Sequence, residues 1–127
     1  MSEVVLDASA LIAYFNQERG HELVEPYLNG AQLCSVNLSE VAARLIERGH
    51  RAEDILNDVS ALGVEVVAFG AERAIGAAQL KAGTRFLGLS LGDRACIALG
   101  LERAATVLTA DIAWAGLEAP HQIEVIR

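Results

Sequence analysis

Short apolar runs alternate with longer stretches of helical periodicity along the whole chain. Five runs rich in Val, Ile or Leu predict β-strands at residues 3–6, 32–36, 64–69, 106–109 and 123–126. Between them, apolar residues recur at helical spacing, which predicts helices over residues 8–16, 22–28, 37–47, 52–62, 72–81 and 91–99. Glycines follow most of these stretches and are expected to mark the helix ends, at Gly30, Gly49, Gly63, Gly83 and Gly100.

This alternation predicts an α/β fold. Strands that are apolar along their whole length are typical of a parallel sheet with helices on both faces. We therefore expect a three-layer α/β/α sandwich with a central, mostly parallel sheet of about five strands. The 127 residues fit a single domain over residues 1–127. In such folds, ligands bind outside the carboxyl ends of the strands, near the point where the strand order reverses.

Composition and charge argue against some classes of function. The formal net charge of −7 argues against a general nucleic-acid binder, because neutralising phosphates requires an excess of Lys and Arg. Aromatic residues make up 5% of the chain, which argues against an aromatic surface that stacks on bases. If RNA is the substrate, its contacts must be local or must be supplied by a metal ion.

Cysteine usage and the amino terminus indicate a cytoplasmic protein. Cys34 and Cys96 lie far apart without the spacing of a metal site, so we expect buried, reduced thiols. The start of the chain carries no basic segment, and the longest apolar stretch, residues 8–15, is too short to cross a bilayer. We therefore expect no membrane association.

Four acidic residues are predicted to meet at one edge of the sheet. Asp7 directly follows the first predicted strand, and Asp111 lies two residues after the fourth. Glu40 and Asp93 fall in the first turns of helices that begin after loops at the same edge. Four neighbouring anions would raise one another's pKa and cost stability unless a cation were bound. Oxygen ligands alone favour a hard cation such as Mg²⁺, which can activate water for attack on a phosphodiester.

Helix capping is the alternative explanation for each acid taken alone. Asn37 followed by Glu40 matches a capping box, and Ser90 followed by Asp93 has the same spacing. Asp7 and Asp111 are equally suited to cap the segments that follow them. Capping does not require the caps to cluster, and a residue can serve as cap and ligand together.

The residues at these positions resemble those of the PIN domain, and in particular the VapC-type toxins of bacterial toxin–antitoxin pairs. Four motifs carry the resemblance in order along the chain: "VVLDASALIAYF", "SVNLSEVAARL", "LSLGDRACIALG" and "VLTADIAW". They contain the four acids together with Ser9, Asn37 and Thr109.

The resemblance implies a PIN-like sandwich with Mg²⁺-dependent endoribonuclease activity, in which Mn²⁺ can substitute. It also implies a homodimer, a cognate antitoxin that neutralises the protein, and structured RNA such as tRNA or rRNA as substrate. Catalytic and metal-binding roles would fall to Asp7, Glu40, Asp93 and Asp111, with Asp7 and Asp93 as the principal ligands. Ser9, Asn37 and Thr109 would support the site, with the two hydroxyls orienting carboxylates or water. Some relatives carry a further acid shortly after the position of Asp111, where this chain has Ile-Ala-Trp, so the number of metal ions stays open.

Other functions share parts of this pattern. A phosphoacceptor receiver domain also has an acidic Mg²⁺ pocket, but it needs paired acids after the first strand and a Lys after the fifth. A haloacid-dehalogenase-like phosphatase needs a second Asp where Ser9 stands. A catalytically inactive PIN-like binding module also remains open. Several arginines have open roles in binding RNA or antitoxin, or in surface ion pairs: Arg44, Arg48, Arg51 and Arg94.

Overall fold

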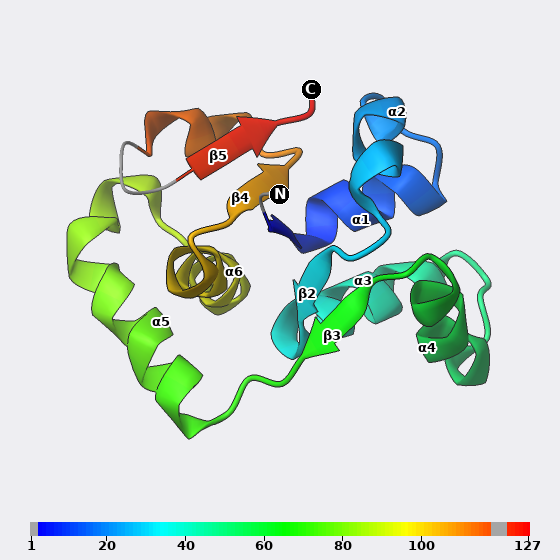
Figure 1. The fold of residues 1–127 in the computed structure, drawn as a ribbon, viewed down its shortest axis with the longest axis horizontal. Coiled ribbons are helices and arrows are strands. Elements are labelled where there is room, and N and C mark those ends of the chain that lie inside the picture. Colours follow the sequence, from blue (N-terminus) through cyan, green and yellow to red (C-terminus); the bar gives the residue numbers. More distant parts are fainter. Residues whose placement is uncertain (1–2, 118–121) are drawn as a thin grey trace.

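The computed structural model, which describes residues 3–117 and 122–127, has the predicted α/β architecture (Figure 1). Five parallel strands form one sheet in the order β3-β2-β1-β4-β5. The strands are β1 (Val4–Leu6), β2 (Gln32–Cys34), β3 (Glu65–Val67), β4 (Thr106–Thr109) and β5 (Gln122–Val125). The α-helices are α1 (Ala8–Phe15), α2 (His21–Val24), α3 (Ser35–Glu47), α4 (Ala52–Ala61), α5 (Ala71–Gly83) and α6 (Leu91–Arg103). Three short 3₁₀ turns complete the fold: η1 (Glu25–Tyr27), η2 (Arg85–Leu87) and η3 (Ile112–Gly116).

Two apolar clusters cover the two faces of the sheet. Successive residues of a strand point to opposite faces, so Leu6 joins a cluster with α1 and α3 while Val5 joins one with α6. Trp114 of η3 is buried in the second cluster. Figure 1 shows α5 and α6 on one side of the sheet and α1, α3 and α4 on the other. The predicted three-layer sandwich is confirmed.

The junction between β2 and α3 differs from the sequence prediction. β2 ends at Cys34 and α3 begins at once at Ser35, so the strand predicted to residue 36 and the helix start at Asn37 were both wrong. Cys34 is the N-cap and makes no side-chain capping bond, so the predicted Asn37–Glu40 capping box does not form. The Ser35 hydroxyl instead accepts a hydrogen bond from the backbone N–H of Phe69 (2.9 Å), which ties the start of α3 to the segment after β3.

Two helix boundaries also differ, each for a physical reason. Gly100 was expected to end a helix, but α6 continues to Arg103, and Gly100 lies where a Cβ atom would collide with Val107. The helix predicted over residues 22–28 is divided into α2 and η1 at Pro26, whose nitrogen has no hydrogen to donate. Both predictions missed tertiary or local backbone constraints.

The strand order reverses between β1 and β4. The chain first builds β1, β2 and β3 outward in one direction and then crosses to β4 and β5 on the other side of β1. Crevices outside the carboxyl ends of strands at such a reversal are where ligands bind in this fold type. Among the described residues, no helix combines the length and apolar character needed to cross a lipid bilayer. Cys34 and Cys96 are buried free thiols, as expected.

Candidate active site

A cavity of about 430 Å³ opens at the carboxyl edge of the sheet, where β1 and β4 lie side by side. All four predicted acids line it: Asp7, Glu40, Asp93 and Asp111. Asp7 follows β1, Glu40 lies in α3, Asp93 in the first turn of α6, and Asp111 at the start of η3. Ser9 and Asn37 line the same cavity, and Thr109 is buried beside it.

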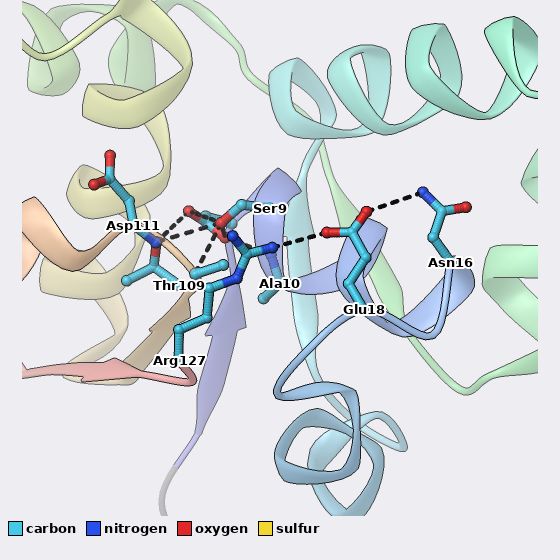
Figure 2. A network of polar contacts seen from close by, with 9 residues as sticks. Ser9, Ala10, Asn16, Glu18, Thr109, Asp111 and Arg127 are labelled. Atoms are coloured by element: carbon cyan, nitrogen blue, oxygen red, sulfur yellow. Dashed lines mark hydrogen bonds and ion pairs between the residues drawn. The ribbon is translucent and has the colours of Figure 1, made fainter.

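Asp7 is the most buried of the four acids, and it accepts hydrogen bonds from Ser9, Ala10 and Thr109, which are labelled in Figure 2. It is the N-cap of α1, where its Oδ1 accepts from the backbone N–H of Ala10 at 2.8 Å. The Ser9 hydroxyl lies 2.7 Å from Oδ1 and 2.9 Å from Oδ2, and the Thr109 hydroxyl donates to Oδ2 at 2.6 Å. The side chain is only 5% exposed, so the protein itself supplies these partners in place of water.

Burial raises the pKa of Asp7 from 3.8 to about 6. The hydrogen bonds from Thr109, Ser9 and Ala10 lower this pKa and oppose the effect of burial, while the negative charge of Asp93 raises it slightly further. The ionised form of Asp7 is therefore destabilised in the metal-free protein, and a bound cation would stabilise it.

The two hydroxyl groups also connect Asp7 to the end of β4. Ser9 Oγ accepts from the backbone N–H of Ala110 at 2.9 Å, and Thr109 Oγ1 accepts from that of Asp111 at 3.0 Å. Asp111 in turn caps η3, because its Oδ1 accepts from the N–H of Ala113 at 2.9 Å. The exits of β1 and β4 are thus held together through side chains.

Asn37 also joins two elements at the cavity. Its Nδ2 donates to Glu40 Oε1 at 2.9 Å and to the carbonyl oxygen of Gly92 at 3.0 Å, which joins α3 to the first turn of α6. Asn37 is 1% exposed, and its Oδ1 has no hydrogen-bond partner among the described residues. Asp93 forms the predicted capping box with Ser90.

The side chains of the cavity offer the oxygen atoms that a hard cation prefers, but they are not placed as a complete set of metal ligands. Within residues 3–117 and 122–127, no three Asp, Glu, His or Cys side chains are placed close enough to hold a metal ion together. The atoms around the cavity that could ligate a metal ion are nevertheless all oxygens. Three of the four carboxylates are at least partly exposed there. Asn37 Oδ1, which is buried and has no hydrogen-bond partner in residues 3–117 and 122–127, adds a further oxygen beside the cavity. Binding an ion by three of these acids would therefore require their side chains to move closer together.

Three charged residues of the cavity were not assigned to it from the sequence alone. Glu18 and Arg127 form an ion pair at 2.8 Å on the cavity wall, and Arg44 of α3 also lines it. Glu18 and Arg127 are 109 positions apart, and no periodicity or motif connects them. Arg51 pairs instead with Glu53 outside the cavity. Arg94 donates to the carbonyl of Ala77 in α5, and Arg48 does not line the cavity.

Comparison with known proteins identifies the family of this fold and site. The family model of the PIN domain matches residues 4–118, so the chain belongs to the PIN domain family. The resemblance expected from the four motifs is confirmed at this level. The receiver-domain alternative is set aside, since that fold has the strand order 2-1-3-4-5 rather than the order found here. No match was found between the chain and the curated protein sequences compared with it.

Solved structures share the fold over nearly the whole chain. A toxin–antitoxin complex from Klebsiella pneumoniae contains a chain with a TM-score of 0.77 and 16% identity, over 98% of both chains. DNA-bound VapBC from Salmonella typhimurium gives a TM-score of 0.72 and 19% identity over 100% of both chains. A member of the VapBC family from Mycobacterium tuberculosis gives 0.59 and 22%, over 100% of this chain and 99% of the other. At these identities the likeness establishes the fold.

Proposed function

We propose that this PIN domain protein is a metal-dependent endoribonuclease toxin that hydrolyses RNA phosphodiester bonds. The observation that carries the proposal is the convergence of Asp7, Glu40, Asp93 and Asp111 on one cavity at the reversal of strand order. A cavity so rich in carboxylates would repel an RNA backbone unless a cation were bound in it. An all-oxygen donor set at this position is the chemistry that suits Mg²⁺ or Mn²⁺.

The four acids would hold the metal ion together. By the resemblance to the PIN domain, Asp7 and Asp93 would be the principal ligands, and Glu40 and Asp111, both exposed at the cavity, would complete the site. Bound Mg²⁺ or Mn²⁺ would supply a water of lowered pKa and charge stabilisation for the leaving oxygen. Ser9 and Thr109 orient the Asp7 carboxylate, and Asn37 orients that of Glu40.

The structures that share this fold support a proposal about the binding partners of this chain. The structures that share this fold are described as toxin–antitoxin or VapBC complexes. We propose that this chain likewise has a cognate antitoxin that neutralises it, acts on structured RNA such as tRNA or rRNA in the cytoplasm, and forms a homodimer. The whole chain, residues 1–127, is proposed to act as a single domain.

RNA cleavage with and without metal tests the proposed activity. Purified protein should cleave total tRNA in Mg²⁺ or Mn²⁺ and stop when a chelator is added. Asp93→Asn should remove cleavage while the protein stays folded, because it removes a charged ligand without changing side-chain size. Asp58→Asn is the matched control, since Asp58 is an exposed acid of α4 outside the cavity. Cleavage that survives the chelator, or that is equal in the Asp93→Asn protein, would reject the proposal.

A further inference from the structure

Arg127 forms an ion pair with Glu18 at the wall of the acidic cavity. Arg127 Nη2 donates to Glu18 Oε1 at 2.8 Å, and the two side chains are 38% and 29% exposed. Figure 2 shows the Arg127 side chain extending from the end of β5 toward Glu18, which follows α1. Both residues line the cavity that contains the four acids.

The backbone that carries Arg127 is fixed by the residue before it. Ile126 is 2% exposed, and its N–H donates to the carbonyl of Thr109 at 2.8 Å. Gly20 lies against the Ile126 carbonyl so closely that a Cβ atom would collide with it, and its φ of +93° also favours glycine. The chain after β5 is therefore packed between β4 and the turn before α2, and it holds the guanidinium at the cavity.

The ion pair leaves most of the guanidinium available. Nη1 and Nε of Arg127 form no hydrogen bond with the residues that the structure describes. Within the described part of the chain, the one hydrogen bond to Glu18 Oε2 comes from Asn16 Nδ2, at 3.4 Å. A partly exposed pair of this type contributes little to stability, so the pair alone does not explain why both side chains lie at the cavity.

The charges around the cavity give Arg127 a distinct position. The described residues that line it include five carboxylates but only two guanidinium groups, those of Arg44 and Arg127. Arg44 already lies 3.7 Å from Glu47 on the same helix. A guanidinium binds phosphate through two parallel hydrogen bonds, which a carboxylate partner can also accept.

We propose that Arg127 binds a phosphate of the RNA backbone beside the acidic site, and that Glu18 is the counter-ion which this phosphate displaces. The inference rests on the proposed nuclease function and names one contact of its substrate. Glu18 holds the guanidinium at the cavity in the RNA-free protein and competes with the phosphate for it. Removing Glu18 should therefore strengthen RNA binding, but only while Arg127 is present.

Binding of fluorescein-labelled total tRNA, measured by anisotropy in Ca²⁺ at several salt concentrations, tests this proposal. Arg127→Gln should weaken binding about tenfold, as expected for loss of a charged hydrogen bond. It should also reduce the slope of log K against log salt by about 0.7 to 0.9, the value for one phosphate contact. Arg127→Lys should fall between, because it keeps the charge and loses the two-pronged geometry. Arg73→Gln, which breaks the Arg73–Glu102 pair outside the cavity, is the control and should change neither quantity.

The double variant of Glu18 and Arg127 shows whether Glu18 weakens RNA binding by competing for Arg127 or only by its negative charge. Glu18→Gln should tighten RNA binding several-fold, and the same change in the Arg127→Gln protein should give a much smaller gain. If the pair only fastens the segment after β5, Glu18→Gln and Arg127→Gln will both lower the melting temperature and neither will alter the salt slope. That result overturns the phosphate role while wild-type cleavage of tRNA upholds the nuclease. If wild-type protein neither binds nor cleaves tRNA, both proposals are wrong.

Discussion

The carboxylate of Glu40 lies directly against the backbone of Gly92, at the point where α3 meets the first turn of α6. A Cβ atom at position 92 would be 2.5 Å from Glu40 Oε2 and 2.6 Å from Oε1. The amide of Asn37 holds both partners, since its Nδ2 donates to Glu40 and to the Gly92 carbonyl. The absence of a side chain at Gly92 therefore leaves the space that the Glu40 carboxylate occupies, and Asn37 holds the carboxylate there.

Gly92→Ala should impair the site without unfolding the protein. The methyl group would push the flexible end of Glu40 away and break its contact with Asn37, while alanine itself suits a helix. We expect RNA cleavage to fall about 10- to 100-fold, the usual effect of disturbing residues that support a metal site. Initial cleavage rates in Mg²⁺, together with thermal melts, would measure both effects.

Gly76→Ala provides the matched control for this substitution. Gly76 lies in α5 with no atom near its Cβ position, so the change should stabilise the protein by about 0.5–1 kcal/mol and leave cleavage unchanged. In a Glu40→Ala background, Gly92→Ala should cause little further loss, because the carboxylate it displaces is gone. Full additivity of the two losses would show that Gly92 does not act through Glu40.

The burial of Asp7 predicts an unusual dependence of stability on pH. Its folded pKa of about 6 lies above the unfolded value of 3.8, so the native state holds this proton more tightly. The stabilisation from the proton is present at low pH and is lost as pH rises between about 4 and 6. A shift of this size corresponds to roughly 3 kcal/mol.

Urea unfolding of wild-type and Asp7→Asn proteins across this range, in metal-free buffer, measures the effect. The variant should gain stability relative to wild type as pH rises, with the difference levelling off above pH of about 7. Titrating groups that do not interact with Asp7 contribute equally to both proteins, so the difference reports Asp7 together with its coupling to Asp93. Parallel stability curves would mean that Asp7 titrates normally.

Thr109 controls the same carboxylate through a buried hydroxyl. It donates to Asp7 Oδ2 and lowers the pKa of Asp7, so Thr109→Val should move the loss of stability to higher pH. The variant should also lose about 1–3 kcal/mol of unfolding free energy at neutral pH, because buried polar groups lose a partner. Thr109→Ser keeps the hydroxyl and should leave the pH dependence unchanged. A shift with serine equal to that with valine would contradict a role for the hydrogen bond.

The sequence predicted the parts of the site that depend on local pattern and sheet direction. Asp7 and Asp111 follow parallel strands, and the carboxyl ends of such strands meet at one edge. Asp93 lies in the first turn of α6, which returns to that edge. Glu40 was also predicted in a first turn, but α3 begins at Ser35, so Glu40 lies beyond its first turn and still lines the cavity. The strand and helix pattern alone was therefore enough to expect all four acids around one cavity.

Contacts between segments that are distant in the sequence could not be predicted from its pattern. Asn37 matched a capping box in the sequence, but its amide instead reaches Gly92, 55 positions away, because α3 begins directly after β2. The pairing of Arg127 with Glu18 depends on how β5 packs against the turn before α2. Neither contact leaves a signal in hydrophobic periodicity, since both are fixed by the folded chain as a whole.

The position of Mn²⁺ in a crystal tests the central claim most directly. Crystals grown with Mn²⁺ and measured at the manganese absorption edge would locate the ion by its anomalous scattering. We predict a peak inside the cavity with oxygens of Asp7 and Asp93 as ligands, and its loss in the Asp93→Asn protein. An RNA-cleaving protein with Mn²⁺ bound elsewhere, or with the peak unchanged by Asp93→Asn, would contradict the account.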